Sequence, residues 1–159
     1  MKKNSKSTLS FVVDVGNSHT VLGIFKGDKV VDHWRLTTRK ETTSDEVMNR
    51  VGGLIHFSKI KPESVTHVGL STVVPSLERP WVKALQTLLK RPVQVVSSKN
   101  CLNCPIAYPN PSTLGADRLC NIIALKERGY SDAIVIDMGT ATTFDVMKDG
   151  GFAGGIIIP

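Results

Sequence analysis

A ten-residue pattern occurs twice in the sequence, first as Phe11-Val-Val-Asp14-Val-Gly16-Asn17-Ser-His-Thr20 and again, 123 residues later, as Ile134-Val-Ile-Asp137-Met-Gly139-Thr140-Ala-Thr-Thr143. In each copy an apolar run typical of a buried strand ends in Asp-x-Gly and a small polar residue, where the chain is expected to turn. The offset extends to the next turn, where Gly27 falls on Gly150. Two copies of strand, turn, strand, glycine turn and strand predict a duplicated domain whose halves face each other.

The residues between the two copies predict the elements that complete the first half. After a three-stranded meander over 11–36, Thr43-Ser44-Asp45-Glu46 has the pattern of a capping box for a helix that ends near Ser58. A strand over 65–71, a helix capped by Ser76 and a short strand over 92–96 follow, which gives the order βββαβαβ. Prolines and asparagines then predict an ordered loop over 100–113, before a helix from Gly115 to about Arg128.

The Asp-x-Gly turns favour phosphate chemistry. Glycine lets backbone amides approach phosphate oxygens, and a carboxylate at the strand end can hold Mg²⁺ directly or through water. Asp14 and Asp137 are expected to meet across a cleft. Neither the P-loop pattern nor the Gly-x-Gly-x-x-Gly pattern occurs, which disfavours those two nucleotide sites.

The composition is that of an ordinary folded chain, with 159 residues, 41% apolar residues and a net charge of +6. The charges are spread in ones and twos, which favours an anionic small molecule over nucleic acid. The apolar runs are too short for the roughly 20 residues of a membrane-spanning helix, and Asp14 interrupts the run behind the basic start, which disfavours a signal peptide. The sequence therefore predicts a cytoplasmic protein that binds neither membrane nor nucleic acid.

The three cysteines do not suit a secreted disulfide framework. Cys101-x-x-Cys104 has the spacing of half a zinc site, but no second pair accompanies it, so reduced structural thiols are favoured over a zinc site.

Three segments, in this order and spacing, carry a resemblance to a known family: Asp14 to Phe25, Gly115-Ala-Asp117-Arg118 and Asp137 to Thr143. They resemble the type III pantothenate kinases, the family that includes the Bvg accessory factor. Asp-x-Gly-Asn is shared with the wider superfamily of actin, sugar kinases and heat-shock chaperone ATPases, whereas Gly-Ala-Asp-Arg is far more specific.

This resemblance implies an α/β, RNase H-like duplicated fold of the actin and sugar-kinase superfamily. It further implies ATP-dependent phosphorylation of pantothenate to 4'-phosphopantothenate, the first step of coenzyme A biosynthesis. Mg²⁺, a monovalent cation (K⁺ or NH₄⁺) and a homodimer are part of the same expectation.

Carried over residue by residue, the resemblance assigns the ATP contacts to Asp14, Val15, Gly16, Asn17, Ser18, His19, Thr20, Val21 and Thr140. Asp14 would lie beside the divalent metal, held through phosphate, and Asp137 would ligate the monovalent cation. Pantothenate would be held by Tyr108, Gly115, Ala116, Asp117 and Arg118.

Chemistry agrees with these roles. A primary hydroxyl needs a positioned carboxylate to take its proton as it attacks the γ-phosphate, so Asp117 is the predicted general base. Arg118 offers a forked donor for the carboxylate of pantothenate, and the helix start near Gly115 adds positive potential.

Each assignment has a simpler alternative. Asp117 and Arg118 are also ordinary helix-start residues, Tyr108 also suits packing in a proline-rich loop, and His19 is more typical of a solvated turn than of an acid or base. Two other functions stay open: another kinase of the superfamily with a different hydroxylated substrate, and a non-catalytic regulatory or accessory remnant.

The repeat and the resemblance together predict a basic tail at 1–10, a first domain at 11–129 and the start of a second at 130–159. The second copy contains three strands, whereas full-length family members continue past Pro159. We therefore expect an uncovered apolar face made by Ile134, Ile136, Phe144, Val146 and residues 156–158.

Overall fold

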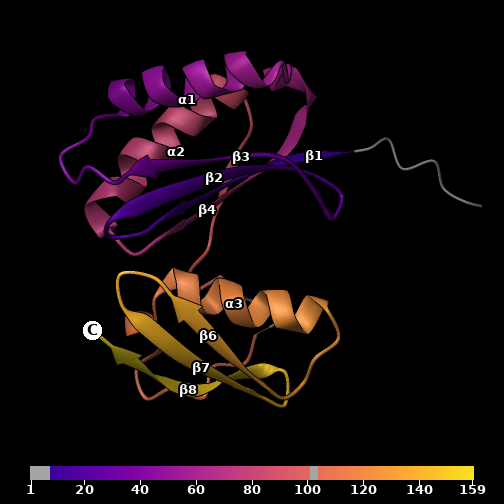
Figure 1. The fold of residues 1–159 in the computed structure, drawn as a ribbon, viewed down its shortest axis with the longest axis vertical. Helices are drawn as coiled ribbons and strands as arrows, with labels where there is room; N and C mark the ends of the chain where they lie inside the picture. Colours follow the sequence, from indigo (N-terminus) through magenta and orange to yellow (C-terminus); the bar gives the residue numbers. More distant parts are fainter. Residues whose placement is uncertain (1–7, 101–103) are drawn as a thin grey trace, which may run out of the picture. The chain divides into compact units, whose positions relative to one another are not determined.

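The computed structural model describes residues 8–100 and 104–159, which form two compact units (Figure 1). The first unit ends at Val95 and the second begins at Val96. Most of the predicted basic tail lies outside the described residues, as does Cys101 of the cysteine pair. The compact units divide after Val95, whereas the boundary after residue 129 follows the repeat and stays a prediction.

A five-stranded sheet with the order β3-β2-β1-β4-β5 forms the first unit. Its strands are β1 (Leu9–Val15), β2 (His19–Lys26), β3 (Lys29–Thr37), β4 (Val65–Thr72) and β5 (Val93–Val95). The first three strands are antiparallel, which confirms the predicted meander, and β4 and β5 continue the sheet in parallel with β1. A parallel neighbour requires a crossover connection, and the chain between β3 and β4 supplies it with a helix.

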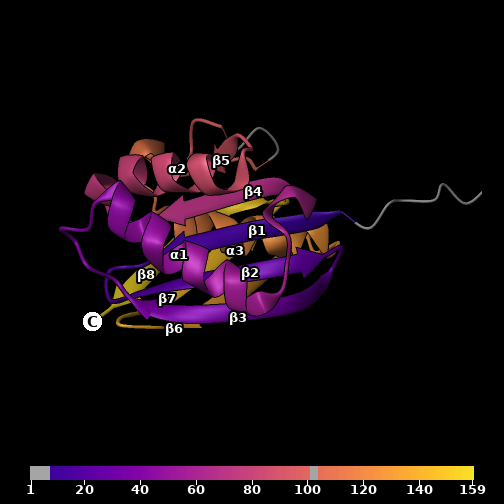
Figure 2. The ribbon, with the colours of Figure 1, turned by 90° about the horizontal axis from the view of Figure 1, so that it is seen from above.

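Two helices, α1 (Ser44–Ser58) and α2 (Pro75–Leu89), cover one face of this sheet (Figure 2). Side chains along β1 alternate between the faces, so Phe11, Val13 and Val15 are buried in the same core as the helices while Val12 and Asp14 are exposed. No helix within the two described ranges is long and apolar enough to cross a membrane.

The helix starts confirm one of the two predicted caps. The Glu46 amide donates to Thr43 Oγ1 at 3.3 Å and the Thr43 amide donates to the Glu46 carboxylate at 2.7 Å, which is the predicted capping box. The prediction that Ser76 caps α2 is wrong, because the helix begins one residue earlier, at Pro75. Proline has a φ suited to the first helical position, and the N–H that it lacks would have no partner within the helix there.

The described residues of the second unit form a three-stranded antiparallel sheet and one α-helix. Its elements are a short 3₁₀ turn (Pro111–Thr113), α3 (Ala116–Glu127), β6 (Ala133–Met138), β7 (Thr142–Lys148) and β8 (Gly151–Ile158). The loop before α3 belongs to this unit because it pairs with β8: the Phe152 amide donates to Pro105 O and the Ala107 amide donates to Phe152 O, both at 2.8 Å. α3 packs on one face of the sheet, over Met147 and Phe152.

The hairpins β1–β2 and β6–β7 have equivalent strand pairing, but their loops differ in length by one residue. The Gly16 amide donates to His19 O at 3.0 Å, and the Gly139 amide donates to Ala141 O at the same distance, so the second loop is one residue shorter. The offset of 123 residues up to Gly139 therefore becomes 122 in the strands that follow.

The strand pairing of the next two hairpins, β2–β3 and β7–β8, confirms that the offset is 122 residues after the first loop. Both β2–β3 and β7–β8 are joined by two-residue turns, between Lys26 and Lys29 and between Lys148 and Gly151. Each pair also has its register shift at the equivalent position, after Ile24 in the first copy and after Val146 in the second. The predicted alignment of Gly27 with Gly150 is wrong, because the structure aligns Gly27 with Asp149.

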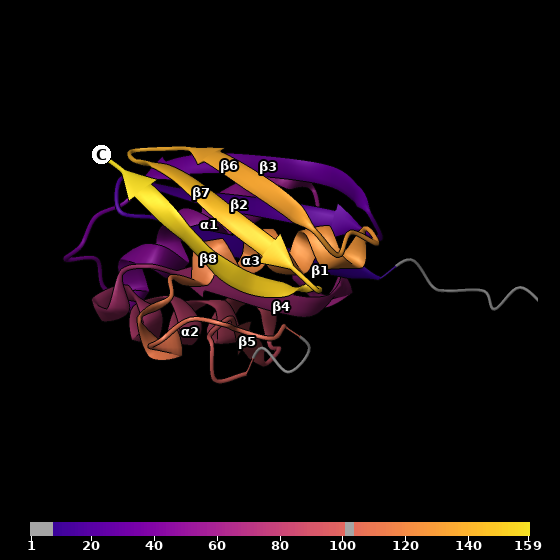
Figure 3. The ribbon, with the colours of Figure 1, turned by 90° about the horizontal axis from the view of Figure 1, so that it is seen from below.

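Within the described residues of the second unit, no element covers the face of the β6–β8 sheet opposite α3 (Figure 3). We call it the open face; its exposed apolar residues are Ile134, Ile136, Met138, Val146, Ile156 and Ile158. Ile134 is 66% exposed, whereas Phe11, its equivalent in the first unit, is fully buried. The prediction of an uncovered apolar face is therefore confirmed at Ile134, Ile136, Val146, Ile156 and Ile158. Phe144 lies on the same face but is only partly exposed, and Ile157 pairs with Thr143 and lies on the α3 side.

We expect residues 1–159, expressed as they stand, to self-associate through the open face. Burying an isoleucine side chain contributes about 1.5–3 kcal/mol, so pairing such a face with another surface is favourable. Light scattering as a function of concentration measures the association, and Ile134→Lys with Ile136→Lys should reduce it strongly. Val30→Lys on β3, which is also exposed, is the control and should have little effect. A chain that stays monomeric at all concentrations would contradict this expectation.

Candidate active site

The hairpin of β1 and β2, from Asp14 near the end of β1 to Val21 in β2, contains all the residues predicted to contact ATP except Thr140. Asp14 is exposed near the end of β1, and the loop then turns at Gly16. A Cβ on Gly16 would lie 2.9 Å from His19 O, so this turn requires glycine. Asn17 and His19 are exposed, which leaves the loop surface polar and accessible.

Hydrogen bonds to the end of β3 hold this loop in place. The Thr38 amide donates to Ser18 O at 2.9 Å, and the hydroxyls of Thr20 and Thr38 are 2.8 Å apart. Thr20 is almost completely buried, so its side chain serves the fold of the loop rather than its surface.

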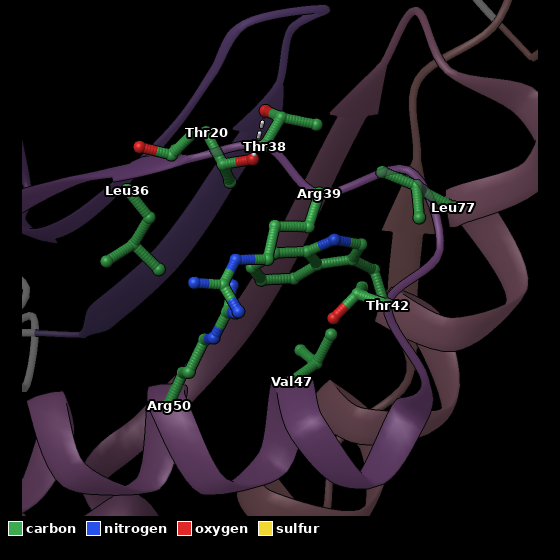
Figure 4. Close-up of a pocket in the computed structure, with 10 residues that line it drawn as sticks. Thr20, Leu36, Thr38, Arg39, Thr42, Val47, Arg50 and Leu77 are labelled. Carbon is green, nitrogen blue, oxygen red and sulfur yellow. Dashed lines mark hydrogen bonds between the residues drawn. The ribbon is translucent and has the colours of Figure 1, made fainter.

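Thr20 also lines a small pocket of the first unit, between the end of β3 and α1 (Figure 4). Arg39 and Arg50 extend into it from opposite walls, and Trp81 contributes to the lining. The internal volume is about 10 Å³, which holds about one water molecule. This pocket is therefore too small to be a nucleotide site.

The equivalent turn of the second copy places Asp137 near the end of β6 and Thr140 in the following loop. Both residues are exposed. Asp137 lies opposite Thr143, so its position in the register is on the face of the sheet that α3 covers.

The Gly115-Ala-Asp-Arg segment forms the start of α3. Gly115 is the N-cap, and Ala116 is buried. Asp117 is partly buried and accepts a hydrogen bond at 2.8 Å from the backbone amide of Arg118. Burial raises the pKa of Asp117 above its ordinary value, and the charges of Asp145 and Asp137 act in the same direction, while Arg118 opposes them.

Arg118 points into the second unit. Its side chain is 9% exposed, and its Nε donates to the carboxylate of the fully buried Asp145 at 2.5 Å. Its guanidinium lies over the ring of Phe152, 5.1 Å from the centroid, and Tyr108 contacts the same ring edge to face. The structure thus brings two of the predicted substrate residues, Tyr108 and Arg118, together on the Phe152 ring, and Asp117 precedes Arg118 in the first turn of α3.

Sequence reasoning missed Asp145, Phe152 and Gly155. Asp145 is a charge within the apolar strand Phe144-Asp145-Val146, and a buried charge in such a place requires a partner. Gly155 lies opposite Asp145, and a Cβ there would overlap the Phe144 carbonyl and Nη2 of Arg118. The strand position of Asp145 was a signal for its role, whereas the need for glycine at 155 depends on the fold.

The predicted residues fall into two groups. Asp14 to Val21 belong to the first unit, and Tyr108, Gly115 to Arg118, Asp137 and Thr140 belong to the second. In the described parts of the chain, no group of three or more His, Cys, Asp or Glu is arranged to hold a metal ion.

The two units and their hairpins define a fold found in sugar kinases. A protein described as a 2-dehydro-3-deoxygalactonokinase from Sinorhizobium meliloti matches 94% of this chain and 52% of its own, with a TM-score of 0.57 and 12% identity. A ROK hexokinase from Thermus thermophilus matches with a TM-score of 0.52 over 91% of this chain and 48% of its own, at 13% identity. These similarities establish the RNase H-like α/β class.

Within this class, the chain belongs to the type III pantothenate kinase family, whose profile matches residues 10–159. The type III pantothenate kinases of Desulfosudis oleivorans and Desulfatibacillum aliphaticivorans are 39% and 42% identical over 93% of this chain. The chain spans 58% of the length of each of these relatives. The family resemblance that the sequence motifs suggested is confirmed.

We expect Gly155→Ala to destabilise the second unit by about 1–3 kcal/mol, since the added methyl overlaps backbone and the Arg118 guanidinium. Chemical unfolding followed by circular dichroism measures the effect. Gly53→Ala is the matched control: no atom lies within 4 Å of its added Cβ, and alanine in a helix interior should stabilise α1 by about 0.5–1 kcal/mol. Equal stability of the Gly155 variant and the wild type would show that Gly155 is not sterically required.

Proposed function

We propose that the full-length protein transfers the γ-phosphoryl group of ATP to the hydroxyl of pantothenate, giving 4'-phosphopantothenate. Family membership supports this activity, and the observation that carries it is the position of Asp117. This carboxylate lies in the first turn of α3 and accepts from the backbone amide of Arg118, whose side chain contacts Phe152 as Tyr108 does.

Asp117 is the proposed general base. Its carboxylate takes the proton of the substrate hydroxyl as that oxygen attacks the γ-phosphorus and the bond to the β-phosphate oxygen breaks. Burial raises the pKa of Asp117, which makes it a stronger base than an ordinary aspartate. Tyr108, Gly115, Ala116 and Arg118 are the proposed surroundings of pantothenate.

The β1–β2 loop is the proposed phosphate site for ATP, and Thr140 is a proposed further contact. Gly16 lets the backbone approach a phosphate closely, and the bonds from Thr38 to Ser18 and Thr20 keep the loop in one shape. A loop that is already ordered loses less entropy when the nucleotide binds.

Asp14 and Asp137 are the proposed cation ligands, for Mg²⁺ and for K⁺ or NH₄⁺ respectively. Both are exposed carboxylates near strand ends, and oxygen donors suit these ions. Mg²⁺ usually takes one or two carboxylates together with phosphates and water, so a single aspartate beside the phosphate loop fits this donor set. When bound, Mg²⁺ neutralises negative charge on the phosphates.

A cytoplasmic homodimer completes the proposal, since ATP is available in the cytoplasm and the family resemblance implies two subunits. Size-exclusion chromatography of the full-length protein tests the subunit number.

A coupled assay of ADP release by the full-length protein tests the function with pantothenate, glycerol, acetate and hexoses as acceptors. Stimulation by pantothenate supports the proposal, and stimulation by another acceptor favours a different kinase of the superfamily. Binding of ATP and pantothenate without turnover would instead indicate a non-catalytic protein. Repeating the assay in potassium, ammonium and sodium-only buffers tests the monovalent cation, because equal rates in all three contradict the role of Asp137.

We expect Asp117→Asn in the full-length protein to lower kcat by about 10²–10⁴-fold while pantothenate still binds, since the amide keeps the shape but cannot accept the proton. Steady-state kinetics and calorimetric binding measure the two effects. Glu127→Gln is the matched control, because it removes the same charge from the exposed end of the same helix. Near wild-type kcat in the Asp117 variant would remove this residue from the role of base.

The pH dependence gives a separate expectation. A base must be deprotonated to act, and burial raises the pKa of Asp117, so activity should fall on acidification at a higher pH than for an ordinary aspartate. The acid limb of kcat/KM for pantothenate in the full-length protein measures this pKa. A pKa from this limb at or below the usual range of aspartate would show that Asp117 is not buried in the free enzyme as described.

A further inference from the structure

The ion pair between Arg118 and Asp145 links the proposed base to the middle of the sheet. Asp145 is fully buried in β7, and its Oδ1 accepts from Arg118 Nε. Arg118 follows Asp117 directly, and its backbone amide donates to Asp117 Oδ1 at 2.8 Å. A continuous set of contacts therefore runs from β7 through Arg118 to the carboxylate of Asp117.

The surroundings leave the Arg118 side chain little freedom. The Phe152 ring lies against the guanidinium, and opposite Asp145 the strand has glycine at 155, where any Cβ would overlap Nη2. Nη2 of Arg118 and Oδ2 of Asp145 are both buried and have no hydrogen-bond partner among the described residues. The bond from Nε to Oδ1 and the packing against Phe152 therefore determine where the guanidinium lies.

We propose that Asp145 is a positioning residue of the kinase, which holds Asp117 in place by fixing Arg118 and the first turn of α3. This inference rests on the proposed function. Because reacting groups must meet in a narrow range of geometry, a displacement of the base by about 1 Å can cost on the order of 10²-fold in rate. Asp145 acts at a distance, so its loss should reduce kcat more than substrate affinity.

Kinetics of Asp145→Ala in the full-length protein test the proposal. We expect kcat to fall by roughly 10- to 100-fold, with the KM for ATP unchanged, since the misplaced group is the base. Asp145→Asn keeps an oxygen that can accept from Arg118 Nε, so it should lose less. Ile122→Ala is the control for lost stability alone: this residue is fully buried on the same helix and its apolar side chain is not a member of the ion pair, so kcat should be unchanged.

A double variant, Arg118→Met with Asp145→Leu, separates positioning from folding. Replacing a buried ion pair by apolar residues is often neutral or stabilising, so the melting temperature should return toward that of the wild type. On our proposal kcat, measured at saturating pantothenate so that weaker substrate binding does not lower it, stays low even so. Recovery of kcat together with the melting temperature, or a kcat for Asp145→Ala that matches that of Ile122→Ala, overturns the proposal.

Hydrogen exchange gives a readout that does not depend on turnover. The amides of Arg118 and Leu119 are hydrogen-bonded in the first turn of α3, and Asp145→Ala should make them exchange faster than Ile122→Ala does. If the wild-type protein does not phosphorylate pantothenate, the proposed function fails, and exchange alone then decides on Asp145. Unchanged exchange at both amides overturns the positioning role whatever the activity.

Discussion

The two-residue period of a strand governs both units of this protein. Along β1 every second side chain enters the core under α1 and α2, and the equivalent side chains of β6 form the open face. The opposite face of β6 and β7 lies under α3 and contains Asp145 and Met147. Alternation along a strand fixes the face on which each side chain lies. The same strand pattern therefore builds a helix-covered core in the first unit, whereas in the second unit it places the Arg118–Asp145 pair on one face and the open face on the other.

The alternation of side chains also explains the buried ion pair of the second unit. Because Asp145 lies on the face that α3 covers, its buried carboxylate requires a positively charged partner, and Arg118 of α3 is that partner. Buried ion pairs contribute little net stability, but losing one partner costs about 3–5 kcal/mol because the other charge remains buried. The main effect of the Arg118–Asp145 pair is therefore to fix the position of α3 on the sheet, rather than to add net stability.

Much of the fold was predictable because its signals are local. The capping box at Thr43, the meander and the start of α3 near Gly115 all depend on neighbouring residues, and each was predicted. The grouping of Tyr108 with Arg118 followed from the family motif rather than from periodicity. A charge within an apolar strand was a signal that Asp145 needs a partner, but sequence spacing does not reveal that Arg118 of α3 is that partner. Gly155 was missed because its role depends on how closely β8 approaches Phe144 of β7 and Arg118 of α3 in the folded unit.

The shorter loop after β6 has a consequence for how the two copies diverged. A residue lost within a strand would turn every later side chain to the other face, whereas a residue lost in the loop leaves the alternation intact. The loss in this chain lies between Gly139 and Thr142, so Phe144 still corresponds to Leu22 and Asp145 to Gly23. Duplicated halves can thus change length independently in their hairpin loops. A chimera that exchanges the two hairpins should therefore be joined at residues with equivalent strand pairing, and not at residues separated by a constant offset in sequence.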